Sequence, residues 1–111
     1  MDRGETTYFG REMKLTLVVT SRAEADLVAA YEWYEQRSPG LGCDFIRRVD
    51  AKLAVVGHSP QLFRKRLGEY RLAATARFPH VIYFILDEAA ARVSIRRILH
   101  FSQNAPAYLT D

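Results

Sequence analysis

Two β-rich runs near the end of the chain decide its fold: Val81-Ile82-Tyr83-Phe84-Ile85-Leu86 and Arg92-Val93-Ser94-Ile95-Arg96-Arg97-Ile98-Leu99-His100. The first run is apolar at every position, which is typical of a strand that is buried on both faces, so we expect it in the interior of a sheet. Residues 87–91, between the runs, are the right length for a turn. We therefore predict that the two runs pair as a hairpin.

The segment before this hairpin shows the pattern of two helices. Ser21 and Glu24 match a capping box, which predicts that the first helix begins at Ser21. This helix should end before Ser38-Pro39-Gly40, because proline disfavours helix in the residue that precedes it. Apolar residues at helical spacing predict the second helix over residues 41–57. Since the link is so short, the two helices should lie antiparallel as a hairpin.

Two further strands complete the order of elements. Residues 15–19 are apolar and β-branched, which predicts a first strand. From Tyr70 to Arg77 the pattern alternates with a period of two, which predicts another strand. The resulting order, β-α-α-β-β-β, predicts an α+β fold in which the helical hairpin packs on one face of a small, mainly antiparallel sheet. We expect the other face to meet solvent or a partner.

The length of 111 residues fits one domain. Residues 1–12 follow neither period, so we predict a flexible N-terminal extension there and a folded domain over residues 13–111. The longest apolar run is far shorter than the roughly 20 residues that cross a bilayer, and residues 1–12 lack the apolar core of a signal peptide. The single cysteine, Cys43, fits a reducing compartment. We therefore predict a cytoplasmic protein without membrane association.

The positive charge lies in the C-terminal half of the chain. The formal net charge is +3, but residues 13–58 carry six basic and six acidic residues, whereas residues 59–111 carry eight basic and four acidic ones. A basic surface suits an acidic partner or nucleic acid. Asp50, Glu69 and Asp87 are too scattered to predict a metal site, and no glycine-rich loop follows a strand. We expect neither a metal nor a cofactor.

Several short motifs follow one another in a specific order. They are Ser21-x-Ala23-x-x-Asp26-Leu27, Tyr31-x-x-Tyr34, Ser38-Pro39-Gly40-Leu41-Gly42-x-x-Phe45, Ser59-Pro60, Arg71, Arg77-Phe78-Pro79-His80-Val81-Ile82-Tyr83 and Arg97-Ile98-Leu99-His100. Together they resemble the RelE/ParE family, the toxins of bacterial type II toxin–antitoxin modules, over residues 13–109. Each motif is weak alone, but their joint order and spacing are specific. The resemblance implies the RelE/ParE fold and a small acidic antitoxin that binds the toxin.

The RelE-like branch of this family cuts mRNA on the ribosome, which needs a base, cations around the phosphate and an acid. Carried over to this chain, the resemblance implies a minimal nuclease set of Arg71, Arg77, His100 and Tyr108. Ala73 replaces a second basic residue, however, and Phe101-Ser102-Gln103 replaces a basic cluster after the last strand. Most of the catalytic set is therefore missing, and we favour no catalytic residue.

The ParE-like branch binds DNA gyrase and traps it on cleaved DNA, and it is the branch that we favour. The resemblance implies a target-binding surface on the last strand and the residues after it: Arg92, Arg96, Arg97, His100, Gln103, Asn104 and Tyr108. Tyr31, Trp33 and Tyr34 are candidates for binding the antitoxin in a hetero-oligomer. The alternatives are a ribosome-dependent mRNA endonuclease and a degenerate toxin that retains only antitoxin binding.

Overall fold

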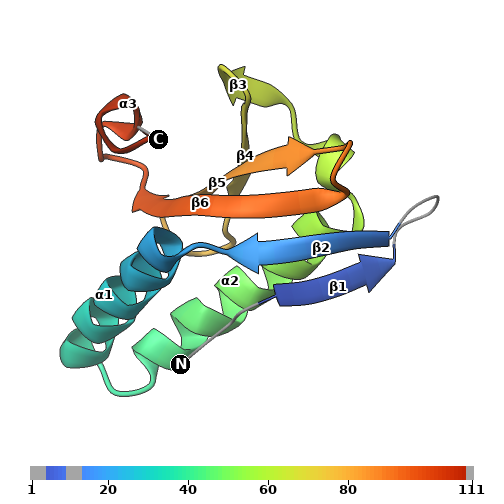
Figure 1. Cartoon of the computed structure of the whole chain (residues 1–111). Coiled ribbons are helices and arrows are strands. Elements are labelled where there is room, and N and C mark those ends of the chain that lie inside the picture. Colours follow the sequence, from blue (N-terminus) through green and yellow to red (C-terminus); the bar gives the residue numbers. More distant parts are fainter. Residues whose placement is uncertain (1–4, 10–13, 110–111) are drawn as a thin grey trace.

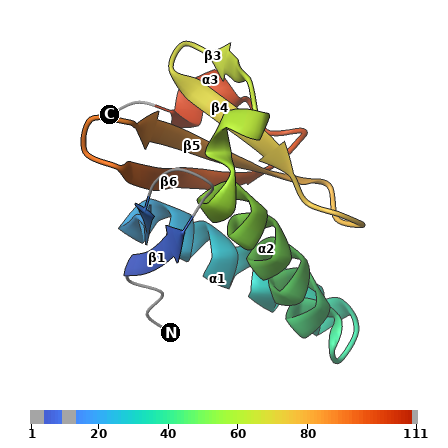
Figure 2. The ribbon, with the colours of Figure 1, turned by 90° about the vertical axis from the view of Figure 1, so that its right-hand side faces the viewer.

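The computed structural model of the chain describes residues 5–9 and 14–109. Within these residues, six strands form one sheet in the order β1-β2-β6-β5-β4-β3, and two long helices cover one of its faces (Figures 1 and 2). The elements are β1 Glu5–Phe9, β2 Lys14–Val19, α1 Ser21–Arg37, α2 Leu41–His58, the 3-10 turn η1 Pro60–Leu62, β3 Lys65–Leu67, β4 Tyr70–Ala74, β5 His80–Asp87, β6 Arg92–His100 and α3 Ala105–Tyr108.

The hairpin of β5 and β6 forms the centre of the sheet, as the sequence predicts. Its register runs from the pair His80 and His100 to the pair Asp87 and Arg92. The register shifts between Tyr83 and Phe84, so that one extra residue, Arg96, stands on β6. Such a bulge bends a strand and redirects its side chains. β5 lies between β6 and β4, which confirms its interior position.

Every pairing between the described strands is antiparallel except one. β2 runs parallel to β6, with Val19 opposite Ile95. A parallel pairing requires a long connection, and here the chain between β2 and β6 contains the helical hairpin and then β3, β4 and β5. The α+β architecture is therefore confirmed, with helices packed on one face of a mainly antiparallel sheet.

The main core fills the space between the helices and the sheet. Its largest fully buried side chains include Phe45 from α2, Phe84 and Ile82 from β5, Ile95 from β6 and Leu27 from α1. These aromatic and aliphatic side chains come from the apolar stripes that predict the helices and from the inward positions of the strands. Burying each of them contributes roughly 1.5–3 kcal/mol.

The opposite face of the sheet carries a second, smaller cluster. Tyr83 and Leu99 are buried there together with Ala105 of α3, and Leu72 and Leu109 pack beside them. Figures 1 and 2 show α3 on the side of the sheet opposite to α1 and α2. The C-terminal segment therefore covers part of the face that we expected to meet solvent or a partner.

Part of the N-terminal extension forms a strand in the structure. Glu5–Phe9 forms β1, which pairs with residues 14–18 of β2. The ring of Tyr8 lies so close to α2 that a Cβ atom at Gly57 would stand 2.4 Å from it, and it meets the His58 ring edge-on at 4.9 Å. The sequence pattern does not predict this strand, and the flexibility of the extension stays a prediction. Residues 1–4 and 10–12 lie outside the described part.

Two smaller predictions also need correction. Thr20, not Ser21, is the N-cap of α1, and its hydroxyl oxygen accepts a hydrogen bond from the Ala23 N–H at 3.3 Å. The strand predicted over residues 70–77 ends at Ala74, because Arg77 adopts a left-handed conformation (φ 71°) in the turn before β5. Within residues 5–9 and 14–109, no helix has both the length and the apolar character needed to cross a membrane.

Candidate functional site

β6 extends beyond the end of its neighbour β2, and residues at the start of α1 bond to this part of β6 in place of a strand. β2 ends at Val19, and the next residue, Thr20, donates its N–H to the Ile95 carbonyl at 3.1 Å and its hydroxyl to the same oxygen at 2.8 Å. Further along, the Ile98 N–H donates to the Asp26 carboxylate at 2.9 Å. Side chains of the α1 region thus replace the missing strand, and the second half of β6 borders two grooves.

Arg97 and Asp26 form the principal ion pair of this region. The Nε and Nη2 atoms of Arg97 each donate to a different oxygen of Asp26 at 2.8 Å, which is the bidentate geometry of the strongest such pairs. The two side chains are only 17% and 14% exposed. The hydrogen bond that Arg97 donates to Asp26 is the main reason why the pKa of Arg97 is raised. Arg97 therefore fastens β6 to α1.

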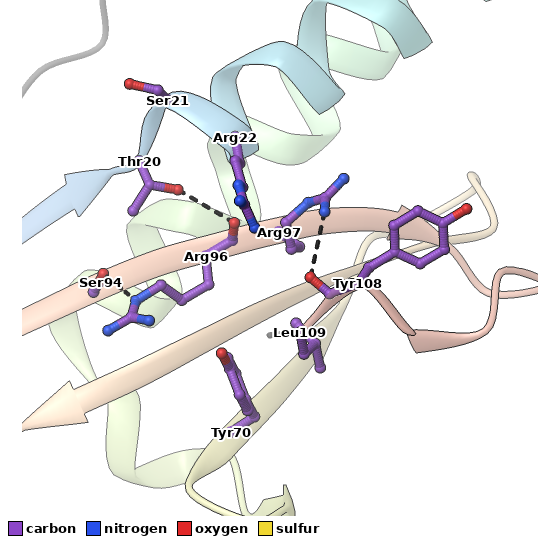
Figure 3. A pocket seen from close by; sticks show the side chains of 9 residues that line it. All are labelled: Thr20, Ser21, Arg22, Tyr70, Ser94, Arg96, Arg97, Tyr108 and Leu109. Atoms are coloured by element: carbon purple, nitrogen blue, oxygen red, sulfur yellow. Dashed lines mark hydrogen bonds between the residues drawn. The ribbon is translucent and has the colours of Figure 1, made fainter. Parts of the chain in front are cut away.

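The first groove, which we call the basic groove, lies between the start of α1, the sheet and the C-terminal segment (Figure 3). Its volume is about 530 Å³. It is lined by Thr20, Ser21, Arg22, Tyr70, Ser94, Arg96, Arg97, Tyr108 and Leu109. Three of these residues are arginines, and none of the described lining residues is acidic. The basic groove is thus suited to an anionic ligand.

Residues of the C-terminal segment close one side of the basic groove. Arg97 donates from Nη1 to the Tyr108 carbonyl at 3.3 Å, and its guanidinium lies 5.2 Å from the centre of the Tyr108 ring (Figure 3). Arg96 is directed by a hydrogen bond from its Nε atom to the Ser94 hydroxyl at 2.8 Å. The bulge in β6 is what places these two consecutive arginines at the same groove.

The second groove, which we call the aromatic groove, lies on the other flank of β6. Its volume is about 580 Å³, and it is lined by Asp26, Ala29, Ala30, Trp33, Tyr34, Pro79, His80, Ile98, His100 and Gln103. Trp33 is 51% exposed, and the Arg37 guanidinium lies 3.5 Å from the centre of its ring. Small alanines beside an exposed indole leave room for the apolar side of a partner helix.

Two histidines face each other at the base of the aromatic groove. His80 is buried, its Nδ1 atom lies 3.5 Å from the Tyr34 hydroxyl, and its ring centre is 5.4 Å from that of His100. Burial, with a smaller effect from His100, lowers the pKa of His80 to about 4. His80 is therefore neutral at physiological pH and belongs to the aromatic packing around Tyr34.

His100 is held in a tight turn at the end of β6. Its Nδ1 atom accepts the Ser102 N–H at 3.1 Å and contacts the Ser102 hydroxyl at 2.7 Å. Its own N–H donates to the Gln103 side-chain oxygen at 2.8 Å. Because the backbone N–H can only donate, Nδ1 must be an acceptor, so the neutral ring carries its proton on Nε2.

The structure does not assemble the four residues of the minimal nuclease set in one groove. Arg77 lines a third groove beside α2, His100 lines the aromatic groove, and Tyr108 lines the basic groove. Arg71 donates to the Phe63 carbonyl at 2.8 Å and lines none of these three grooves. The separation of these side chains gives no support to a shared catalytic centre.

The predicted target-binding residues divide between the two grooves. Arg96, Arg97 and Tyr108 line the basic groove, while His100 and Gln103 line the aromatic groove. The other two lie outside both. They are Asn104, the residue before α3, and Arg92, which lies 3.7 Å from Glu5 of β1.

The predicted antitoxin-binding residues divide as well. Trp33 and Tyr34 line the aromatic groove, but Tyr31 packs against Gly42 of α2, where an added Cβ atom would stand 2.6 Å from the Tyr31 carbonyl oxygen. Sequence reasoning also missed Arg22, Asp26 and Tyr70 as residues of the grooves. The Ser21-x-Ala23-x-x-Asp26-Leu27 motif contains Asp26, but nothing in it points to a partner 71 residues away.

Among residues 5–9 and 14–109, no cluster of three or more histidine, cysteine, aspartate or glutamate side chains is placed to hold a metal ion. The grooves offer guanidinium groups, hydroxyls and aromatic rings, which recognise anions and apolar surfaces.

Comparisons with known proteins agree with this geometry. A solved structure described as the chromosomal ParDE TA system from P. aeruginosa is similar in fold, with a TM-score of 0.69 and 19% sequence identity over 78% of this chain and 95% of that one. A search of curated protein sequences gives no match. Residues 17–105 match the family described as ParE toxin of type II toxin-antitoxin system, parDE. That match covers most of the chain, so the protein belongs to the ParE toxin family.

Proposed function

We propose that this ParE-family toxin inhibits DNA gyrase by binding it directly, and that a cognate antitoxin neutralises it. Family membership supports a toxin with an antitoxin partner. The observation that carries the choice of target surface is the basic groove, where Arg96 and Arg97 of β6 meet the C-terminal Tyr108. Gyrase and its DNA are in the cytoplasm, so the proposal also assigns the toxin to that compartment.

The aromatic groove is the proposed docking site of the antitoxin. It is the groove that combines an exposed indole, small alanines and the apolar Ile98, and these are the contacts that an amphipathic helix needs. An acidic antitoxin also complements the basic C-terminal half of the chain. Folding of such a segment on the toxin would join the two proteins into a hetero-oligomer.

Both proposed partners use residues of the aromatic groove. His100 and Gln103, predicted for the target, lie beside Trp33 and Tyr34, predicted for the antitoxin. An antitoxin helix in this groove would therefore cover part of the surface that the target needs. Neutralisation by occlusion follows from this overlap and requires no change in the toxin's conformation.

The test of the target is a supercoiling assay with purified toxin, gyrase, ATP and relaxed plasmid. We expect loss of supercoiling and accumulation of linear DNA. Arg96→Ala should weaken inhibition, whereas Arg47→Ala, which removes an equal charge from an exposed pair on α2, should not. Unchanged supercoiling at a large excess of folded toxin would refute the gyrase proposal. Cleavage of mRNA on purified ribosomes would then favour the endonuclease, and inactivity in both assays would indicate a degenerate toxin.

The test of the antitoxin site is a binding measurement with the cognate antitoxin. Trp33→Ala should weaken binding at least tenfold, as expected for a central aromatic anchor, because such residues contribute about 2 kcal/mol or more. Leu62→Ala is the matched control, since Leu62 is also a large exposed apolar side chain (73%) but lines neither groove. Equal affinities for the two variants would place the antitoxin elsewhere.

A further inference from the structure

We propose that the basic groove is a nucleic-acid site, which binds phosphate groups of a single-stranded or locally unpaired DNA segment and stacks a base on a tyrosine ring. Its part in gyrase poisoning rests on the function proposed above. The binding itself needs no gyrase. It can therefore be measured on the toxin alone.

The charge of the groove is the first support for this assignment. Arg22, Arg96 and Arg97 line it, and none of the described lining residues is acidic. Arg97 is paired with Asp26 at 2.8 Å, so it holds the wall of the groove in place as well as lining it. Guanidinium groups match the oxygens of a phosphate better than ammonium groups do, because their N–H donors form a planar fork.

The position of these arginines is fixed by the fold. The bond from Arg96 Nε to the Ser94 hydroxyl sets the direction of that side chain. Arg22 stands in the first turn of the 17-residue α1, whose N-terminal end adds a partial positive charge. Figure 3 shows both guanidinium groups near the same stretch of β6. The groove is therefore preorganised for an anion.

Two tyrosine rings provide the surface for a base. Tyr70 and Tyr108 both line the groove (Figure 3), and Tyr108 is 38% exposed. Each base that stacks on an aromatic ring contributes about 1–3 kcal/mol, whatever the base. Arginines beside aromatic rings are the combination by which proteins hold single strands without reading their sequence.

The lining favours a nucleic acid over an acidic protein segment. An acidic helix needs apolar anchor points in addition to charge. In the basic groove, Leu109 is the single aliphatic side chain among the described lining residues, whereas the aromatic groove contains Ala29, Ala30 and Ile98. The two grooves are thus chemically distinct, and the charged one matches a polyanion with flat bases.

The experiment measures fluorescence anisotropy of a labelled 12-nucleotide single-stranded DNA with the full-length toxin, over a series of salt concentrations (a length of about 12 suits such sites). Arg22→Gln/Arg96→Gln should weaken binding at least tenfold at low salt. It should also reduce the slope of the logarithm of the binding constant against the logarithm of the salt concentration by about 1.4, because two phosphate contacts are lost at about 0.7 each. Tyr108→Leu should weaken binding about fivefold or more with the slope unchanged.

The matched control is Arg47→Gln/Arg48→Gln, which removes the same charge from α2 and should change affinity less than twofold. Equal losses in the two double variants would show non-specific attraction and overturn the assignment. Displacement of the DNA by poly-glutamate at lower concentration than by unlabelled oligonucleotide would overturn it in favour of an acidic protein ligand. Far-UV circular dichroism establishes that each variant is folded, and Tyr108→Leu tests the groove independently of charge.

The same variants separate this inference from the gyrase proposal. If the toxin binds the oligonucleotide through the groove but leaves supercoiling unchanged, the groove assignment stands and the gyrase proposal fails. If the toxin poisons gyrase while the groove variants bind the oligonucleotide as the wild type does, the groove assignment fails and the gyrase proposal stands.

Discussion

Replacing Asp26 by alanine should destabilise the fold by about 3 kcal/mol. The Asp26 carboxylate accepts two hydrogen bonds from Arg97 at 2.8 Å and one from the Ile98 N–H at 2.9 Å. Removing one partner of a buried pair typically costs about 3–5 kcal/mol, because the other charge stays buried without compensation. The two side chains retain 14% and 17% exposure, so water can hydrate part of the guanidinium and the lower end of that range applies.

The measurement is urea unfolding followed by far-UV circular dichroism at pH 7. With a slope of about 1.5 kcal/mol per molar urea, the loss should lower the midpoint by about 2 M. Asp44→Ala is the matched control. It removes the same side chain from a helix, but the partner there is Arg47 in a pair that is 58% and 72% exposed. Exposed pairs contribute about 0–1 kcal/mol, so this control should unfold almost as the wild type does.

A double-mutant cycle isolates the interaction from the side chains themselves. Asp26→Ala combined with Arg97→Met removes both charges, and the double variant should be less destabilised than the sum of the two single variants. If Asp26→Ala cost no more than Asp44→Ala, or if the two single effects simply added, the pair would not fasten β6 to α1. The account of Arg97 as a supporting residue would then be wrong.

Three further predictions concern packing and protonation. Burial lowers the pKa of His80 to about 4 from about 6.5 in the unfolded chain, so the stability that neutral His80 contributes is complete above pH 6.5 and is lost as the pH falls from 6.5 towards 4. The free energy of unfolding, measured with urea, should fall by up to about 3 kcal/mol over that window. His80→Leu should remove this part of the pH dependence. Gly57→Ala should destabilise the fold by about 1–3 kcal/mol, because the added methyl group clashes with the Tyr8 ring. The same substitution should be neutral or slightly stabilising in a Tyr8→Ala background. Stabilisation in the wild-type background would contradict the packing of β1 on α2. Thr20→Ala should cost about 1–2 kcal/mol in thermal unfolding and Ser21→Ala less than about 0.5, and the reverse ranking would restore the capping box at Ser21.

The sequence predicts the order of the main elements because their patterns are local. The uniformly apolar run at 81–86 indicates an interior strand, and apolar residues at helical spacing indicate α1 and α2. β1 and β3 are missed for different physical reasons. β3 is only three residues long, too short to show a period. β1 contains Thr6, Thr7 and Tyr8, which favour strands, but its pairing with β2 is a tertiary interaction that no local pattern reveals.

The candidate site is predicted less well than the fold, because its residues meet only through tertiary contacts. Arg96 and Arg97 look equivalent in the sequence, yet the bulge in β6 and the distant Asp26 give them different roles. Trp33 and Tyr34 are adjacent and both line the aromatic groove, but Tyr31 packs against α2 instead. Sequence reasoning points to β6, which borders both grooves, whereas the division into two grooves depends on tertiary contacts beyond the end of β2.

The parallel pairing of β2 with β6 has a consequence for synthesis of the toxin. β2 spans residues 14–19 and β6 spans residues 92–100, so the sheet closes only after nearly the whole chain has left the ribosome. Contacts so distant in sequence form late, because a long loop must close first. A chain interrupted before Arg92 would expose the edges of β2 and β5, which are templates for aggregation. We therefore expect translation to release the toxin in an all-or-none manner, with no active fragment for the antitoxin to intercept.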